Sequence, residues 1–460
     1  MYSSILSLAI TSSVSQFNGG SNLKETILHQ MAPPPTDLVN DHPGSRCQDG
    51  DQHDLELQGT KELDISDPQL AELSVQNLME GPQNTLHEIA FVTVLCCSQL
   101  MNQVGLAISI APLRIIGSSF GIGNPGQDSW MPAAYSLTVG TFILIAGRLG
   151  DLYGHKKLVI AGFAWYALWS LLAGFSVYSN IIFFDCCRAL QGIGPAFLLP
   201  NSIAILGQTY KPGLRKSIIF SLFGATAPSG FVIGAVFSSF LTERLWWPWD
   251  YWIMSVSLLV LTVMGYFVIP YIPPPVLDDS ESTFARVDGW GSITGISGLL
   301  LINFAWNQAP VVGWSNPYIY ILLITGFIFM GLFSFVESRI AKFPLIPPEV
   351  RSADIGYLLA CLAFGWASFG IWIFYFWQVL EGLRNLSPLL VTARLSPNAV
   401  SGFCAAIVTS LLIGRIPGSA IMLIALLAFA TGNILLATVP VHQTYWAQIF
   451  VAAIVTPWGT

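Results

Sequence analysis

The sequence predicts an all-α membrane protein with many spanning helices. Of its 460 residues, 53% are hydrophobic and only 10% are charged, whereas soluble domains carry about 25% charged residues. From residue 89 onward, apolar runs recur at the length of about 20 residues that a helix needs to cross a bilayer. These runs lack the alternation of β-strands, and backbone groups in lipid must pair within the segment, so we expect helices. The composition argues against a soluble enzyme, and no basic patch indicates a nucleic-acid partner.

Eleven spans, and the start of a twelfth, follow from the apolar runs. A twelfth run begins near Tyr445 and stops at Thr460. Charges are costly in hydrocarbon, and we expect Asp185 and Arg188 to be the charged residues inside the membrane. The predicted spans are 89–111, 132–149, 159–177, 181–207, 217–241, 252–272, 289–308, 318–336, 355–379, 390–412 and 419–438.

The first 87 residues form an acidic tail. They hold twelve acidic and three basic residues, a net charge of −9, whereas the rest of the chain carries +2. Such a polar segment cannot bury enough apolar surface to offset its ordering entropy, so we predict a disordered cytosolic tail over 1–87. The mildly apolar start lacks the basic region and the length of a signal peptide.

The Lys and Arg residues of the loops predict the orientation. With the N-terminus in the cytosol, eleven of them fall in inner loops and at most four in outer loops, as the positive-inside rule requires. The inner set is Arg148, Lys156, Lys157, Lys211, Arg215, Lys216, Arg286, Arg339, Lys342, Arg351 and Arg415, and the outer set is Arg114, Arg244, Arg384 and Arg394. A polar cytosolic loop at 273–288 separates the first six spans from the rest, which is the layout of transporters built from repeated bundles.

A distinctive loop follows the second span. The segment 147–157, Gly-Arg-Leu-Gly-Asp-Leu-Tyr-Gly-His-Lys-Lys, resembles the signature loop G-x-L-a-D-r-x-G-r-k of the major facilitator superfamily. Gly147, Asp151, Gly154 and Lys156 match it. The glycines permit a tight turn, and a charge contact of Asp151 can form in one arrangement of the bundles and break in the other. The resemblance implies a gating motif; the alternative is an ordinary positive-inside turn.

The fourth span carries a second motif. Arg188, Gln191, Gly192 and Gly194 follow the pattern R-x-x-Q-G-x-G, which resembles the superfamily motif attributed to proton coupling. Asp185 precedes Arg188 by three residues and shares its helix face, which predicts a buried ion pair. The alternative is an ion pair with a purely structural role.

The fifth span resembles the antiporter motif g-x-x-x-G-P-x-x-G-G. Gly224, Pro228, Gly230 and Gly234 fit the pattern loosely, with Ala227 in place of the glycine before the proline. The spacing of Gly230 and Gly234 lets two helices approach closely, so packing alone is the alternative reading.

Longer stretches resemble one fungal branch of the superfamily. Residues 133–157, 185–210 and 220–237 are similar to the aminotriazole-resistance, boron-efflux and low-affinity ammonium transporters, which belong with fourteen-span drug:proton antiporters. The resemblance implies an N-terminal six-helix bundle over 88–272, two extra helices over 289–354 and an incomplete C-terminal bundle over 355–460. The sequence is therefore expected to be a shortened gene model, a processed fragment or a degraded transporter.

Polar and aromatic side chains within the spans are candidates for a substrate pathway. Amides can line a cavity, and aromatic rings can stack on flat or cationic ligands. The alternatives are hydrogen bonds between helices for the amides and lipid contact for the rings. The amide candidates are Gln99, Asn102, Gln103, Asn201, Asn303, Asn307, Gln378 and Asn433, and the aromatic candidates are Trp306, Trp366, Trp372 and Tyr375. Gln103 occupies the position where many relatives have an acidic residue, and no predicted span after the sixth contains Asp or Glu.

These observations favour a monomeric, proton-coupled exporter of drugs, toxins or a secondary metabolite that works by alternating access. The alternatives are a transporter of a small solute such as ammonium or borate, and a sensor or inactive remnant that does not transport. The seven Cys and six His show no metal-ligand spacing, so no metal and no cofactor is expected. The resemblance implies the plasma membrane, with the vacuolar membrane as the alternative.

Overall fold

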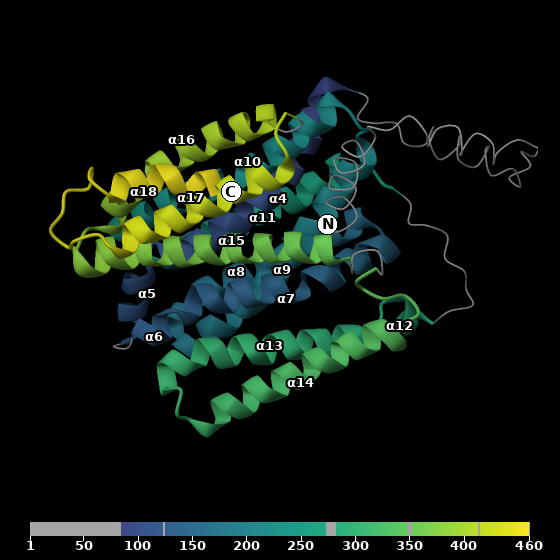
Figure 1. Cartoon of the computed structure of the whole chain (residues 1–460), viewed down its shortest axis with the longest axis horizontal. Coiled ribbons are helices and arrows are strands. Elements are labelled where there is room, and N and C mark those ends of the chain that lie inside the picture. The colour runs from purple at the N-terminus through teal and green to yellow at the C-terminus, as the bar shows by residue number, and fades with distance from the viewer. Residues whose placement is uncertain (1–83, 123–124, 273–281, 348–351, 413–414, 460) are drawn as a thin grey trace, which may run out of the picture. The chain divides into compact units, whose positions relative to one another are not determined.

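The computed structural model describes residues 84–122, 125–272, 282–347, 352–412 and 415–459. The predicted disordered tail, except for its last four residues, and most of the predicted loop at 273–288 lie outside these residues. The described part is helical almost throughout (Figure 1), and each of the eleven predicted spans falls largely or wholly within one helix.

The first group consists of six long helices. α9 packs against both α7 and α8, α10 packs against α4, and α11 packs against α8. The short helices α5 (Leu113–Ser119) and α6 (Pro125–Asp128) connect α4 to α7. The six helices are α4 (Thr85–Ile110), α7 (Trp130–Tyr153), α8 (His155–Phe175), α9 (Ile181–Thr209), α10 (Leu214–Arg244) and α11 (Pro248–Val268).

A helical hairpin follows the sixth helix. After the short α12 (Thr283–Arg286), α13 (Gly289–Val312) and α14 (Pro317–Arg339) pack against each other, and α13 also packs against α7. Figure 1 shows the hairpin directly beside α7.

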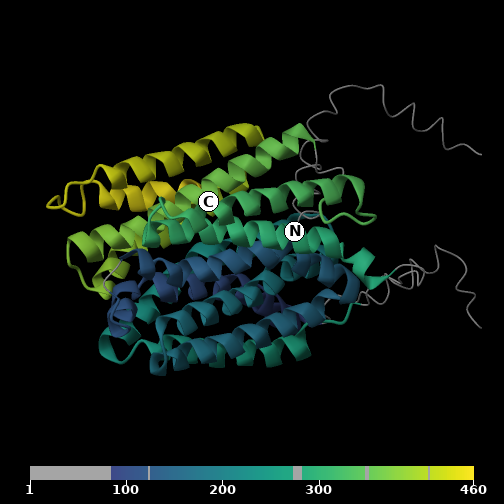
Figure 2. The same ribbon diagram turned by 90° about the horizontal axis from the view of Figure 1, so that it is seen from below.

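The last helices form a second group. α15 (Ala353–Trp377) continues as a π-helix, η3 (Gln378–Leu383), and α16 (Pro388–Leu412) packs against α10 of the first group. α17 (Gly418–Ala437) packs against α15 and against α18 (Ile449–Val455), which the short η4 (Thr456–Gly459) follows. Seen from below, the yellow helices near the C-terminus and the blue helices near the N-terminus lie on opposite sides (Figure 2).

Polar caps set where several helices begin. Asn180 accepts a hydrogen bond from the backbone N–H of Phe183 at 2.8 Å, at the start of α9. Asp288 accepts from Gly291 N at 3.1 Å, at the start of α13. Such side chains satisfy N–H groups that the first helical turn leaves unpaired.

Within the described ranges, nine helices are long and apolar enough to cross a membrane: α4, α7 to α11, α14, α15 with η3, and α17. The predicted spans at 289–308 and 390–412 are helices as well, α13 and α16. Amides such as Asn303 and Asn307 make α13 more polar, and Arg394 and Asn398 do the same for α16.

Several helices extend beyond the apolar runs, and three acidic residues lie in these extensions. Asp250 lies in the first turn of α11, Glu337 in α14 and Glu381 in η3, and all three are buried. These three acidic residues lie just outside the predicted spans, so no predicted span after the sixth contains Asp or Glu. Arg148 and Arg394, however, fall within the predicted spans 132–149 and 390–412, so Asp185 and Arg188 are not the only charged residues in the predicted spans. Hydrogen bonds stabilise two of these buried carboxyl groups: Asp250 accepts from Ser238 and Thr242, and Glu337 accepts from the backbone N–H groups of Leu345 and Ile346 at 3.0 and 3.2 Å.

Small residues let helices of the first group approach closely. A Cβ atom added at Gly234 would lie 2.8 Å from Cα of Val104, and one at Gly230 would lie 2.6 Å from the carbonyl oxygen of Leu100. Both contacts join α10 to α4, so the Gly230–Gly234 spacing brings these two helices into close contact. On α9, a Cβ at Gly192 would lie 2.3 Å from the Tyr135 carbonyl oxygen of α7.

Candidate functional site

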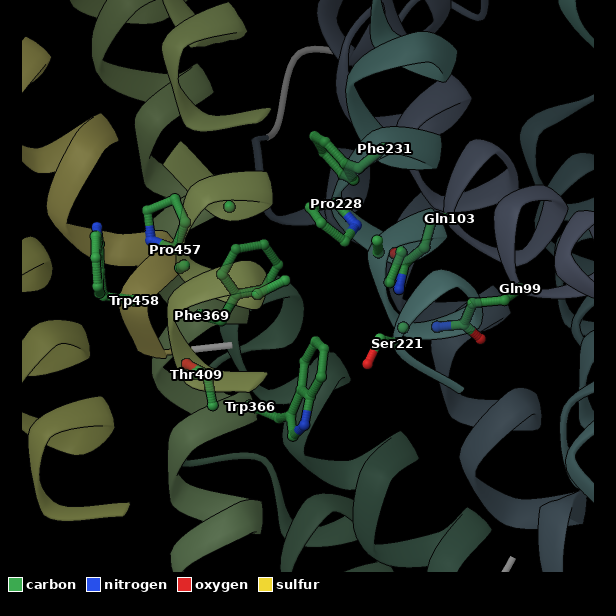
Figure 3. Close-up of a pocket in the computed structure, with 16 residues that line it drawn as sticks. Gln99, Gln103, Ser221, Pro228, Phe231, Trp366, Phe369, Thr409, Pro457 and Trp458 are labelled. Carbon is green, nitrogen blue, oxygen red and sulfur yellow. The ribbon is translucent and has the colours of Figure 1, made fainter. Parts of the chain in front are cut away.

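A cavity of about 320 Å³ lies between the two helix groups. α4 and α10 form one wall, and α15, α16 and η4 form the other (Figure 3). Its lining residues are Gln99, Gln103, Ser221, Gly224, Ala225, Ala227, Pro228, Phe231, Trp366, Phe369, Gly402, Ala405, Ala406, Thr409, Pro457 and Trp458.

The lining combines aromatic rings with neutral polar groups. Gln99 and Gln103 extend from α4, while Trp366 and Phe369 approach from α15 on the opposite wall (Figure 3). None of the lining residues that the structure describes is charged. Such a surface suits a neutral ligand with a flat apolar body and a few hydrogen-bonding groups, because rings supply contact area and amides can both donate and accept.

The cavity lies toward one end of the helices. The basic end is the end of the helices where the connections between α7 and α8 and between α9 and α10 lie, with Lys156, Lys157, Lys211, Arg215 and Lys216 in or beside them. Ser221 lies in the second turn of α10, and Thr409 lies one turn before the end of α16, so both are close to that end.

The two helix groups touch each other at the opposite end. The hydroxyl groups of Ser239 and Thr392 are 2.9 Å apart and fully buried. Glu243 of α10 accepts from the Leu389 N–H of α16 at 2.7 Å, and Arg114 Nη1 donates to the Glu381 carbonyl oxygen at 3.3 Å. The cavity is therefore sealed at the end away from the basic loops.

Apolar packing continues this seal. The rings of Phe231 and Trp377 meet edge to face with centroids 6.0 Å apart. They belong to a buried cluster that joins both groups and also contains Ile110 of α4, Trp372 of α15 and Val391 of α16. Separating the groups at this end would expose the cluster.

Arg188 is held by backbone and neutral side-chain acceptors. It is fully buried, and its Nη2 donates to the Gly105 carbonyl oxygen at 2.7 Å and to Ser109 Oγ at 3.0 Å. Nε donates to the Met131 carbonyl oxygen at 3.2 Å, and Nη1 donates to Gln191 Oε1. These bonds engage four of the five N–H groups of the guanidinium without an acidic partner.

The predicted ion pair between Asp185 and Arg188 is wrong. Both residues are on α9, but Arg188 is bonded to α4, α7 and Gln191, and no ion pair within 4.0 Å joins it to Asp185 in the described part of the chain. Asp185 Oδ1 is buried without a hydrogen-bond partner among those residues. The guanidinium lies instead 4.5 Å from the centre of the Tyr135 ring, which stabilises the cation through its π electrons.

The polar network around Arg188 extends across four helices. Gln191 donates to Ser170 Oγ at 2.6 Å, and the hydroxyl groups of Tyr135 and Tyr166 are 2.9 Å apart. Tyr135 also contacts the side-chain oxygen of Asn102 at 3.0 Å. Asn102, predicted as a pathway residue, is therefore part of this network and not of the cavity lining.

The signature loop between α7 and α8 is a tight turn at the basic end. Gly154 has φ +95°, a backbone conformation that side chains disfavour, so this turn requires glycine. Asp151 Oδ1 lies 3.6 Å from His155 Nε2, and the Asp151 side chain is 60% exposed. Lys156 lies over the Tyr266 ring, 5.6 Å from its centre, and Gly147 packs against Pro200.

Asn201 supports this loop. It is fully buried, its Oδ1 lies 2.8 Å from His155 Nδ1, and its Nδ2 donates to the Ala146 carbonyl oxygen at 3.1 Å. A Cβ at Gly150 would lie 1.7 Å from Asn201 Oδ1, so glycine is needed there too. The sequence predicts Asn201 as a pathway residue, but it lies behind the signature loop and outside the cavity.

The remaining sequence predictions divide between the cavity and other places. Gln99, Gln103 and Trp366 line the cavity, as do Gly224 and Pro228 of the antiporter-like motif. Gly194 packs against Tyr166 of α8.

The other pathway candidates lie elsewhere. Trp306 is 57% exposed and contacts Trp314, and Tyr375 is 55% exposed. Trp372 is fully buried between Phe369 and Phe376. Asn303 and Asn307 line a separate pocket between α7 and α13. Asn433 donates to the Ser368 carbonyl oxygen of α15 at 3.1 Å, Gln378 begins η3, and neither lines the cavity.

Several lining residues were missed by the sequence reasoning. Ser221, Thr409 and Trp458 come from three separate elements and share no motif. Phe369 could have been found, because it lies three residues after Trp366 and so shares its helix face.

The comparisons with known proteins agree with this architecture. A model of the Major Facilitator Superfamily matches residues 93–460. The low affinity ammonium transporter of Saccharomyces cerevisiae is 62% identical over 398 residues, which cover 86% of this chain and 77% of the relative. Efflux pump terJ of Aspergillus terreus is 52% identical over 382 residues, which cover 83% and 74%.

A solved structure shows the same fold. The crystal structure of the peptide transporter POT in complex with sulfate matches with a TM-score of 0.55 and 19% identity, covering 84% of this chain and 83% of that one. With the family match over most of the sequence, the helical architecture and close relatives that are transporters, the chain belongs to the Major Facilitator Superfamily and is a multi-pass membrane transporter.

Proposed function

We propose that this transporter exports small, neutral or weakly basic organic compounds from the cytosol. The observation that supports this most strongly is the uncharged cavity with Gln99 and Gln103 on one wall and Trp366 and Phe369 on the other. An anionic substrate would lack a counter-charge there, whereas a flat heterocycle would gain ring stacking and amide hydrogen bonds.

The arrangement of contacts supports alternating access. By the positive-inside rule the basic end would face the cytosol, and the cavity would then lie on the cytosolic side of the sealed outer contacts. Export requires the outer contacts, such as Ser239 with Thr392, to separate while the cavity closes toward the cytosol. A few polar contacts and one apolar cluster hold the outer seal among the described residues, which suits an equilibrium between two states.

Three of the sequence expectations enter this proposal. Residues 88–272 and 355–460 would move against each other as two bundles, with the helices of 289–354 attached to the first. Asp151 would serve the gate at the cytosolic end. Protons would be the coupling ion, with Asp185 and the Arg188 network as the coupling groups. We further propose that the transporter acts as a monomer in the plasma membrane.

Ammonium transport is the second candidate. It is favoured by the 62% identity with a protein named low affinity ammonium transporter. Trp366 and Phe369 offer ring faces that attract a small cation. The cavity has no carboxylate among its described lining residues, however, so a permanent cation would lack a counter-charge there.

Accumulation assays separate the two candidates. Yeast cells that lack their own exporters would express the full chain and receive radiolabelled 3-amino-1,2,4-triazole or radiolabelled methylammonium. Lower aminotriazole accumulation, abolished by Arg188→Ala, supports export of neutral compounds. A change in methylammonium alone supports the second candidate, and unchanged accumulation of both, with the protein at the cell surface, contradicts both.

A further inference from the structure

A second pocket lies between α7 and the helical hairpin. Its volume is about 410 Å³, and it is separate from the cavity between the two helix groups. Ser136, Leu137 and Gly140 of α7 face Leu299, Asn303 and Asn307 of α13 across it. The sequence predicts Asn303 in the main pathway, and no proposed step of transport uses this pocket.

The pocket is polar at the depth where the bilayer is least polar. Gly140 is the eleventh of the 24 residues of α7, and Asn303 is the fifteenth of the 24 residues of α13. Both are therefore near the middle of their helices. Polar groups exposed to hydrocarbon at that depth cost free energy unless a hydrogen-bonding partner occupies the site.

The two asparagines keep unused hydrogen-bonding capacity. Asn303 Nδ2 donates to the Leu299 carbonyl oxygen at 3.0 Å, and Asn307 Nδ2 donates to the Asn303 carbonyl oxygen at 2.9 Å. Each bond uses one amide hydrogen. Neither side-chain oxygen accepts a hydrogen bond from another described residue, so both remain available as acceptors.

Hydrogen bonds near both ends of α7 join it to α13 and α12. Trp130 Nε1 of α7 donates to Gln308 Oε1 of α13 at 2.9 Å. At the other end of α7, Arg148 Nε donates to the Arg286 carbonyl oxygen at 3.0 Å. The middle is open: a Cβ atom added at Gly140 would meet no atom within 4 Å.

We propose that this pocket binds a neutral, membrane-dissolved molecule that carries a hydroxyl or amine group. No charged residue is among the described residues that line it, and a charged ligand at mid-depth would be costly. The ligand's hydroxyl or amine group would donate to Asn303 and Asn307, while Leu137 and Leu299 contact its apolar body. A membrane sterol and a transported compound share this chemistry.

Photolabelling tests the site without depending on transport. The purified full chain in lipid nanodiscs would be irradiated with a diazirine derivative of octanol, a neutral alcohol that partitions into bilayers, and adducts would be located by peptide mass spectrometry. We expect adducts within 133–141 and 299–307 that excess octanol prevents. Adducts only elsewhere would overturn the proposal.

Two substitutions make the test specific. Gly140→Leu fills the open space, and labelling of both segments should fall to the level measured in a sample that is not irradiated. Gly331→Leu is the matched control, because Gly331 of α14 also has open space around it but does not line the pocket, and labelling should persist. Equal labelling in both variants would contradict the proposal.

A third variant covers the case in which Gly140→Leu does not fold. Asn303→Leu combined with Asn307→Leu removes the acceptors, and labelling should fall about fivefold for the loss of about 1 kcal/mol of hydrogen bonding. Competition by ergosterol would support a membrane sterol as the occupant, and competition by aminotriazole would support a transported compound. If octanol, ergosterol and aminotriazole all fail to compete, the labelling is not saturable and the proposal is overturned.

Discussion

Arg188 stacks on Tyr135: its guanidinium carbon lies 4.5 Å from the centre of the Tyr135 ring, within a site that is fully closed to solvent. The same guanidinium lies 5.7 Å from the Tyr251 ring centre. Two aromatic faces and several neutral acceptors thus stabilise a charge for which a carboxylate partner was expected. This arrangement leaves Asp185 without a direct contact to Arg188.

Tyr135 should therefore stabilise the fold mainly through its ring. Tyr135→Leu removes both the aromatic face above the guanidinium and the hydroxyl, and should cost about 3 kcal/mol, of which about 2 kcal/mol is the desolvated cation–π contact. Tyr135→Phe keeps the ring and should cost less, about 1 kcal/mol for the hydrogen bonds of its hydroxyl. Thermal unfolding of the detergent-solubilised protein measures both. Equal loss in the two variants would show that the ring face contributes nothing.

The packing of α10 on α4 should be sensitive to a single methyl group. Gly234→Ala places a Cβ atom 2.8 Å from Val104 Cα and should destabilise the protein by about 1–3 kcal/mol, the usual cost of overpacking. Gly224→Ala, on the same helix, is the control, since no atom lies within 4 Å of the added carbon. The temperature of unfolding should fall in the first variant alone; a similar fall in both would refute the close approach.

Asp250 should tie α11 to α10 through two hydroxyl groups. Its Oδ2 accepts from Ser238 at 2.6 Å and from Thr242 at 3.1 Å, and the carboxyl is buried. Asp250→Ala leaves both hydroxyls without their acceptor, and we expect a loss of about 2–3 kcal/mol, whereas Asp250→Asn, which keeps an oxygen acceptor, should lose about half of that. Expression level and thermal unfolding report the difference. An Asn variant as unstable as the Ala variant would mean that the negative charge itself is required.

The aromatic wall of the cavity should matter more for export than an exposed tryptophan. Trp366→Leu should reduce aminotriazole export about fivefold to tenfold, as expected for the loss of about 1–1.5 kcal/mol of ring contact with the substrate. Trp306→Leu is the matched substitution outside the cavity and should leave export unchanged. The measurement that compares the two variants is the export rate, normalised to the amount of protein at the cell surface. Equal rates in the two variants would place the substrate elsewhere.

The sequence was sufficient to predict the helices and the membrane class, because hydrocarbon imposes the same apolar requirement on every span. The packing role of Gly230 and Gly234 was also predictable, since their spacing is local to one helix. Sequence patterns within one helix do not reveal the contacts that a side chain makes with helices far away in the chain. Asp185 and Arg188 share a helix face, yet Arg188 is drawn to the Gly105 carbonyl oxygen of α4, 83 positions away in the chain.

The candidate site was predicted only in part for the same reason. The α4 amides Gln99 and Gln103 were found because polar residues are conspicuous in an apolar run. Thr409 and Trp458 become neighbours only through the packing of α16 and η4, which no motif marks. Glu381 was missed because hydropathy locates the apolar centre of a span, and this residue lies in the π-helical extension of α15.

Alternating access requires, above all, that the outer contacts separate during transport. Ser239 and Thr392, whose hydroxyl oxygens are 2.9 Å apart, would be replaced together by cysteine, and aminotriazole transport would be measured in proteoliposomes after oxidation and again after reduction. We expect the disulfide to abolish transport and reduction to restore it, while the Ser239→Cys single variant remains active in both conditions. Full transport by the cross-linked protein would contradict alternating access through this seal.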